Sequence, residues 1–142
     1  MRLSLLTLAA LLATSGCVQP TTPEPQPIAA ASAPDHHNAR NALDWAGTYQ
    51  GTLPCASCNG IKTTLTLQDN GHYRLNEVYL GNPETVSDSN GTFSWNEAGD
   101  TVTLFGENRR YVVAENQLIA LNPDNSRPTG PLADAYILQK TR

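Results

Sequence analysis

The sequence predicts an all-β fold, in which about eight short antiparallel strands form a small barrel or sandwich. Alternating runs of apolar and polar residues begin near residue 43, and clusters of turn residues separate them at intervals of about 8 to 12 residues. No stretch of this region has the apolar spacing of a helix of useful length. Consecutive tight hairpins favour up-and-down neighbours, and about eight strands suffice to close a barrel, which also removes exposed sheet edges.

Residues 1–16 have the features of a secretory signal peptide and are kept apart from the fold prediction. Arg2 supplies a positive charge, residues 3–13 are almost wholly apolar, and small residues lead to Cys17. An apolar run of this length is too short to span a membrane as a stable helix. An exported chain reaches an oxidising compartment, where a disulfide can form and persist.

Residues 14–17 resemble the cleavage box of bacterial lipoproteins, although Leu is usual where Thr14 stands. The resemblance implies that the thiol of Cys17 is acylated and that the acyl chains, such as palmitate, hold the protein on a membrane. Ordinary cleavage after Ser15 is the alternative, and it would leave a free thiol at Cys17. Val18 replaces the Asp of the inner-membrane retention signal, which favours the outer membrane, facing either the periplasm or the cell surface.

Residues 17–42 are predicted to be the lipidated cysteine and a disordered linker, which leaves residues 43–142 as a single β domain. Prolines recur through the linker without any apolar periodicity, so it cannot build a core and favours an extended, partly stiff tether. The formal net charge of −4 argues against nucleic acid as a partner and against electrostatic binding to anionic lipid. The lipid anchor is therefore the expected contact with the membrane.

The expected strands follow from the alternation and from the turn residues between them. In chain order they cover residues 45–53, 61–67, 73–79, 92–95, 101–105, 111–114, 118–121 and 136–140. Asp69, Asn70 and Gly71 form a strong hairpin signal between the second and third strands. Two polar segments rich in turn residues, 80–91 and 122–134, are expected to be loops.

One face of these strands is apolar and is expected to point into the barrel. The expected inward side chains are Trp45, Tyr49, Leu53, Ile61, Leu65, Leu67, Tyr73, Leu75, Phe93, Trp95, Val102, Leu104, Tyr111, Val113, Leu118, Leu121 and Ile137. An eight-stranded barrel interior is either filled by such side chains or keeps a small cavity, and the sequence is compatible with both.

The most distinctive local feature is the Cys55-x-x-Cys58 pair between the first two strands. Pro54 ends the first strand because it lacks a backbone donor, and Gly60 releases the chain into the second, so the sulfurs are expected at a rim. Three interpretations are open. Cys55 and Cys58 can close the loop as a structural disulfide, or they can bind Cu(I), which accepts few soft ligands. The third is a thioredoxin-type redox catalyst, but that chemistry belongs at a helix N-terminus, which a strand–loop–strand setting does not provide.

Other polar residues carry weaker signals. His36 and His37 lie in the predicted linker and would bind copper only weakly, and His72 follows a hairpin turn and is expected to be solvated. Arg109 and Arg110 are a turn pair too small for a basic patch. The sequence has no Ser/His/Asp order at a recognisable spacing, no glycine-rich phosphate loop and no close carboxylate pair on a strand, so no enzymatic activity is expected.

The cysteine pair is part of a longer motif. The motif reads Trp45-x-Gly47-x-Tyr49-x-Gly51-x-Leu53-Pro54-Cys55-Ala56-x-Cys58-x-Gly60-Ile61. It continues as Thr63-x-Leu65-x-Leu67, Gly71-x-Tyr73 and Gly91-x-Phe93-x-Trp95, with Leu118 and Leu121 ending a later hairpin. This pattern, from about residue 43 to residue 140, resembles the N-terminal domain of the copper-resistance lipoprotein family NlpE. The Leu-Pro-Cys-x-x-Cys-x-Gly-Ile block is its most specific part.

The resemblance implies a lipocalin-like β-barrel on the outer membrane with a non-enzymatic binding or sensory role. It implies a part in copper tolerance, in surface sensing or adhesion, and in envelope-stress signalling to an inner-membrane sensor kinase. Cys55 and Cys58 match the cysteine pair of the family's N-terminal domain; no cofactor is required, and Cu(I) is the candidate metal. The best-known members carry a second, C-terminal OB-like domain with another cysteine pair, and that domain is not expected here.

Two other function classes stay open. The barrel interior can carry a small hydrophobic ligand, as lipocalins do, and such a ligand would be found by native mass spectrometry. Alternatively, the protein is a structural envelope lipoprotein with an inert disulfide, which would have a strongly reducing potential.

Overall fold

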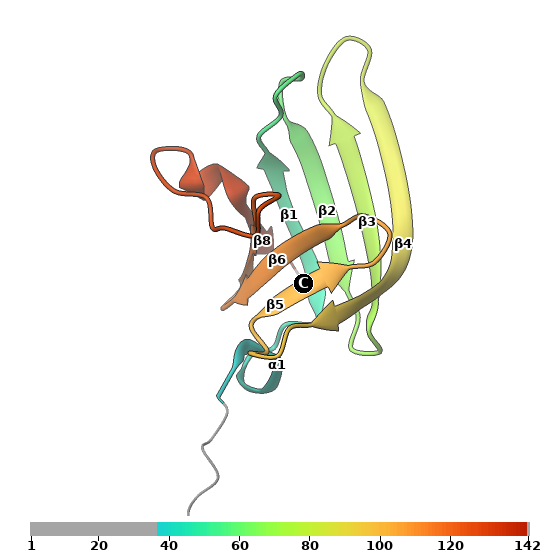
Figure 1. Cartoon of the computed structure of the whole chain (residues 1–142). Helices are drawn as coiled ribbons and strands as arrows, with labels where there is room; N and C mark the ends of the chain where they lie inside the picture. Colours follow the sequence, from blue (N-terminus) through green and yellow to red (C-terminus); the bar gives the residue numbers. More distant parts are fainter. Residues whose placement is uncertain (1–36, 142) are drawn as a thin grey trace, which may run out of the picture. The chain divides into compact units, whose positions relative to one another are not determined.

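Eight antiparallel strands close into a barrel in the computed structural model, which describes residues 37–141 of the chain (Figure 1). The strands are β1 (Gly47–Leu53), β2 (Ile61–Leu67), β3 (His72–Tyr79), β4 (Thr85–Trp95), β5 (Thr101–Leu104), β6 (Arg109–Ala114), β7 (Gln117–Ala120) and β8 (Ile137–Lys140). Each strand pairs with the next, and β8 pairs with β1, which confirms the predicted all-β class and the closed barrel. The predicted signal peptide, the lipid site Cys17 and His36 lie outside the described residues. None of the described helices is long and apolar enough to cross a membrane.

Strand β4 is longer than predicted, and the expected loop over residues 80–91 is wrong in its second half. The strand pairs with β3 from Tyr79↔Thr85 to His72↔Thr92. Its polar side chains are mostly exposed and lack apolar alternation, so the sequence offers no strand signal. Backbone pairing with β3 determines the conformation instead, because a strand can form on an exposed surface if its ladder bonds are satisfied.

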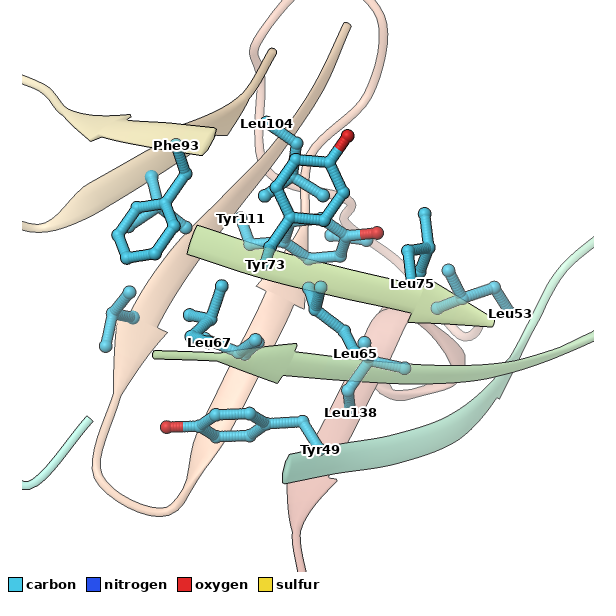
Figure 2. Close-up of a cluster of buried hydrophobic side chains, with 14 residues drawn as sticks. Tyr49, Leu53, Leu65, Leu67, Tyr73, Leu75, Phe93, Leu104, Tyr111 and Leu138 are labelled. Carbon is cyan, nitrogen blue, oxygen red and sulfur yellow. The ribbon is translucent and has the colours of Figure 1, made fainter. Parts of the chain in front are cut away.

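The middle of the barrel is filled by apolar side chains that alternate along the strands (Figure 2). The buried cluster comprises Tyr49, Leu53, Leu65, Leu67, Tyr73, Leu75, Phe93, Val102, Leu104, Tyr111, Val113, Leu118, Ala120 and Leu138. Two predicted inward residues are wrong: Ala120 and Leu138 are buried in place of Leu121 and Ile137, which stay partly exposed. Successive strand residues face opposite sides, so an error of one position exchanges the inward and outward sets.

One end of the barrel, here called the aromatic end, is covered by helix α1 (Ala39–Ala42) (Figure 1). Three aromatic side chains, Trp45, Phe93 and Trp95, contact one another there. The ring centroid of Trp45 lies 5.8 Å from that of Phe93 and 5.2 Å from that of Trp95, both in edge-to-face geometry. This geometry is the one that aromatic quadrupoles favour. The indole of Trp45 also donates to the Arg40 carbonyl at 3.0 Å, which ties the segment before β1 to the helix.

Helix α1 lies inside residues 17–42, so the predicted linker includes residues that are folded against the barrel. The Asn38 side chain caps the helix by accepting from the backbone N–H of Asn41 at 3.1 Å. The Arg40 N–H donates to the Gly99 carbonyl at 3.0 Å, and Ala39 packs against the core. A four-residue helix has no periodicity to detect, and its cap and tertiary contacts hold it in place.

The opposite end, here called the disulfide end, carries the loop of residues 54–60 between β1 and β2 and the connection between β3 and β4 (Figure 1). The chain between β7 and β8 contains a 3-10 helix, η1 (Ala133–Tyr136), which packs beside β1. The two ends of the barrel therefore differ in what covers them.

Candidate functional site

The predicted cysteine pair lies in a short loop that is anchored at both ends. Leu53 pairs with Ile61 where β1 meets β2, so residues 54–60 project beyond the ladder. The Leu80 N–H donates to the Gly60 carbonyl at 2.9 Å, which ties the loop to the β3–β4 connection. Gly60 has a φ of +141°, and a Cβ at this position would lie 2.8 Å from a neighbouring methyl group, so only glycine fits.

Cys55 and Cys58 form a disulfide in the structure, with an S–S distance of 2.03 Å and a Cα–Cα distance of 5.3 Å. Both residues are partly exposed. The loop leaves one strand and enters another, so the N-terminus of a helix does not lie at this pair to lower a thiol pKa. The setting therefore favours a disulfide over thioredoxin-type catalysis.

A metal at this loop would depend on the two sulfurs alone. No group of three or more His, Cys, Asp or Glu side chains is arranged to hold a metal ion in the part of the chain that the structure describes. Cu(I) at Cys55 and Cys58 would require the reduced pair, because a disulfide sulfur is not a thiolate ligand. A closed zinc site needs four ligands and does not fit two. His72 is exposed at the start of β3, near the aromatic end, and cannot complete a site with the cysteines.

A buried ion pair that the sequence reasoning missed lies close to the disulfide end. Glu77 on β3 is 2% exposed, and both of its carboxylate oxygens accept from the Arg109 guanidinium, one of them at 3.1 Å. The Tyr79 hydroxyl donates to the same carboxylate at 3.2 Å. A buried carboxylate is tolerated when it is paired and hydrogen-bonded in this way. The prediction that Arg109 and Arg110 form a turn pair is wrong, because these residues begin strand β6.

Tyr111 stands beside this ion pair and points into the barrel (Figure 2). Burial raises the pKa of Tyr111 to about 12, although the nearby Arg109 cation opposes that rise. The phenol is therefore protonated, and remains a hydrogen-bond donor, across the physiological pH range. Its oxygen is nevertheless a buried side-chain atom without a hydrogen-bond partner among the described residues.

A cavity of about 360 Å³ opens beside Tyr111 at the disulfide end. Its lining includes Leu53 and Pro54 of the cysteine loop, Ile61, Arg109 and Tyr111. This volume is at the lower limit of typical small-molecule sites. The cavity, the ion pair and the disulfide are thus neighbours at one end of the barrel.

The alternation of the third strand contained a signal for Glu77. Residues 73, 75 and 77 share one face of that strand, and the first two are apolar core residues. A carboxylate on a buried face requires a cationic partner, so Glu77 could have been identified as an interior charge. Its partner Arg109 could not, because the pairing joins residues 32 positions apart through the closed barrel.

The comparisons with known proteins agree with this architecture. The family model of the NlpE N-terminal domain matches residues 49–131. The lipoprotein NlpE of Escherichia coli strain K12 is 39% identical over 57 residues, which is 40% of this chain and 24% of that protein. A 17 kDa lipoprotein of Treponema pallidum is 28% identical over 109 residues, which is 68% of this chain and 70% of the relative.

Two crystal structures have the same fold. A Shewanella oneidensis protein classed as a lipoprotein has a TM-score of 0.71 and 47% identity, over 74% of this chain and 96% of that chain. The Cpx pathway activator NlpE of Escherichia coli has a TM-score of 0.51 and 28% identity, over 60% of this chain and 45% of that chain. The sequence match to the Escherichia coli protein spans about a quarter of its length. The chain belongs to the NlpE family, with which it shares the N-terminal barrel domain.

Proposed function

We propose that this protein is a sensory lipoprotein of the cell envelope that works without catalysis and senses through its disulfide end. The observation that carries the proposal is the partly exposed Cys55–Cys58 disulfide, held on a rigid loop at the rim of a closed barrel. Family membership supports a lipoprotein of the NlpE type, and the Escherichia coli relative is described as an activator of the Cpx pathway. The same class of output, an envelope-stress response, is proposed here.

The thiol chemistry of this loop supports a role in copper tolerance. A dithiol reductant of the envelope gives two electrons and two protons to the disulfide, which becomes two thiols while the reductant becomes a disulfide. When Cu(I) binds, the two thiol protons are released to solvent and two soft thiolate ligands remain. Cys55 and Cys58 are already 5.3 Å apart between their Cα atoms, so the reduced sulfurs need little movement to share one ion. The loop would then differ between oxidised, reduced and copper-loaded states, which is the property a sensor needs.

The anchor supports the choice of membrane. We propose that Cys17 carries the lipid, that the protein resides in the outer membrane, and that its contact with the membrane is through acyl chains. A mislocalised or altered barrel would then reach an inner-membrane sensor kinase across the envelope. In this proposal the barrel and its first cysteine pair carry the signal.

A genetic experiment tests this proposal in cells. The gene is deleted and replaced by the wild type, by the double variant Cys55→Ser/Cys58→Ser, or by Ser57→Ala, which changes the same loop without touching a sulfur. Copper tolerance and an envelope-stress reporter are measured in each strain. We expect the cysteine variant to resemble the deletion and Ser57→Ala to resemble the wild type. Unchanged copper tolerance and unchanged reporter output on deletion would refute the proposal.

Direct copper binding is tested by anaerobic Cu(I) titration of the reduced chain carrying Cys17→Ser, so that no acyl group or detergent is present. The chain with both Cys55 and Cys58 should bind one Cu(I) per molecule, whereas a further Cys55→Ser substitution should abolish tight binding. Equal binding by both proteins would remove these thiols from the copper role. A strongly reducing potential of the disulfide would instead favour the structural alternative.

A further inference from the structure

The cavity at the disulfide end, here called the mouth pocket, has the composition of a small-molecule site. Leu53, Ile61 and Ala120 supply apolar surface, and Arg109, Arg110 and Tyr111 supply polar groups. The buried cluster fills the barrel below it, so a ligand would occupy the pocket and would not run through the whole interior. An apolar wall with a few convergent polar groups is the usual make-up of such a site.

Three tyrosines point into this barrel, and comparing their hydroxyls singles out one of them. The Tyr49 hydroxyl donates to the Trp45 carbonyl at 2.6 Å, and the Tyr73 hydroxyl donates to the Phe105 carbonyl at 2.8 Å. The Tyr111 side chain is 1% exposed, and its buried hydroxyl has no hydrogen-bond partner among the described residues. Buried polar atoms are nearly always satisfied, so an exception marks a place where another molecule can supply the missing acceptor.

The neighbours of Tyr111 leave this need unfilled. Arg109 interacts with the Tyr111 phenol and opposes the rise that burial causes in its pKa, but the guanidinium has only N–H donors and cannot accept the hydroxyl proton. The Glu77 carboxylate is the nearby acceptor; its oxygens accept from Arg109 and from Tyr79, and the Tyr111 hydroxyl makes no hydrogen bond to it. Tyr111 is one of the residues that line the pocket, and its buried hydroxyl has no acceptor among the described residues.

The charges around the pocket do not select a strongly charged ligand. Arg109 is neutralised by Glu77, and Arg110 donates to the Asn125 side-chain carbonyl, with Glu107 of opposite sign on the same lining. The missing chemistry is therefore an oxygen acceptor and not a counter-charge. A carboxylate and a neutral carbonyl both provide it, whereas an alkylammonium, which has only donors, does not.

We propose that the mouth pocket binds a small amphiphile whose carbonyl or carboxylate oxygen accepts from the Tyr111 hydroxyl while its short apolar tail lies against Leu53, Ile61 and Ala120. This role is independent of the copper proposal, because neither cysteine sulfur takes part in the binding. Pro54 is shared between the pocket lining and the cysteine loop, so both sites are found on the same end of the barrel.

The test uses the full chain with Cys17→Ser and three probes of equal chain length: octanoate, methyl octanoate and octylammonium. Affinity is measured by calorimetric titration, and the site is located by amide chemical shifts. We expect both oxygen-headed probes to bind and to shift the amides of Tyr111 and Ala120, with octylammonium at least roughly tenfold weaker. Trp45 and Trp95 lie at the opposite end, so indole fluorescence should stay constant.

Two variants and one matched control sharpen this test. Tyr111→Phe keeps the ring and removes the donor, and it should weaken both oxygen-headed probes roughly tenfold. Ala120→Leu fills the pocket and should abolish binding through bulk alone. Tyr73→Phe removes the hydroxyl of another buried tyrosine, which does not line the pocket, and it should change affinity by less than about twofold.

The alternative outcomes overturn the proposal. Failure of both oxygen-headed probes to bind would refute the proposed site. Octylammonium binding as tightly as the oxygen-headed probes would refute it too. Unchanged affinity in Tyr111→Phe would show that the hydroxyl is not the recognition group. Shifts confined to the aromatic end, with altered indole emission, would place the ligand elsewhere.

Discussion

The two ends of this barrel are built from the same strands, but their buried polar groups differ in how completely they are hydrogen-bonded. At the aromatic end, the Trp45 indole and the Tyr49 hydroxyl each donate to a backbone carbonyl, and three rings pack edge to face. At the disulfide end, an ion pair is buried, a cavity is open and the Tyr111 hydroxyl has no partner among the described residues. The aromatic end provides stability, and the disulfide end has an unpaired polar group and a cavity that a ligand can use.

This contrast explains how one small domain can combine stability with function. Unsatisfied polar groups and cavities cost stability, so they persist where something else in the protein offsets that cost. The aromatic end supplies the offset, since rings such as Trp45 combine large buried area with favourable ring geometry. Substitutions at the two ends test this difference.

Trp45→Ala should have the largest effect, because it removes the ring that contacts both Phe93 and Trp95. We expect a loss of about 3 kcal/mol in the free energy of unfolding, at the lower end for Trp→Ala because Trp45 is only partly buried. Urea unfolding followed by circular dichroism measures it. Val86→Ala on exposed β4 is the control and should change stability by less than about 0.5 kcal/mol. A loss below about 1 kcal/mol for Trp45→Ala would contradict the stabilising role of this end.

Glu77→Leu should have the next largest effect, because it leaves the Arg109 cation without its partner. Removing one member of a buried pair costs about 3–5 kcal/mol, but the Arg109 side chain keeps 29% exposure, so we expect about 2–3 kcal/mol. The double variant Glu77→Leu/Arg109→Met should recover much of that loss, since no unpaired charge remains. Additive losses in the double variant would mean that the two residues act separately.

Alkaline pH should destabilise both ends, since each has a buried tyrosine. Burial, aided by the charge of Asp44, raises the pKa of Tyr49 to about 12, and burial raises the pKa of Tyr111 to about 12. An unfolded tyrosine titrates near pH 10, so between about pH 10 and 12 the unfolded state loses its proton first. Stability is complete below about pH 10 and falls by up to about 3 kcal/mol per tyrosine as pH rises through that window.

Urea unfolding at a series of pH values measures this fall, and phenolate absorbance reports the ionisation itself. Tyr49→Phe and Tyr111→Phe should each remove part of the pH dependence. An unchanged slope in Tyr111→Phe would mean that its phenol ionises at an ordinary pH in the folded protein.

Removal of the disulfide should have a smaller effect on stability. The Cys55–Cys58 bridge closes a loop with a sequence separation of 3, and a loop so short constrains little of the unfolded chain. We expect Cys55→Ser/Cys58→Ser to cost at most about 2 kcal/mol in urea unfolding, against about 3 kcal/mol for a 15-residue loop. The near-ultraviolet circular dichroism of the tryptophans should not change, because they lie at the other end. Global unfolding of the variant would contradict a local role for this loop.

The sequence predicted the barrel well because strand alternation and turn residues are local signals. Tyr73 and Leu75 alternate with polar neighbours, and the strand they predict is β3. The motif around Cys55 and Cys58 likewise placed the cysteines between β1 and β2. These features are encoded by residues that are adjacent in the chain.

The features that the sequence did not predict depend on contacts between residues far apart in the chain. The first half of β4 has no apolar alternation and becomes a strand through pairing with β3. Helix α1 is held by Gly99, far along the chain, and the partner of Glu77 is Arg109 on β6. An unpaired hydroxyl such as that of Tyr111 cannot be read from sequence, because a missing contact is a property of the closed barrel.

The smallest expected effects come from the three inward tyrosines, and they differ in sign. Tyr49→Phe and Tyr73→Phe each remove a hydroxyl that donates to a carbonyl, so each should lower the free energy of unfolding by about 1 kcal/mol. Tyr111→Phe removes a buried donor that has no partner, so it should leave stability unchanged or raise it by up to about 1 kcal/mol. Urea unfolding of the three variants near pH 7 measures the difference while all three phenols are protonated. A loss in Tyr111→Phe equal to that in Tyr73→Phe would show that its hydroxyl is already satisfied within the protein, and the two ends would then be alike.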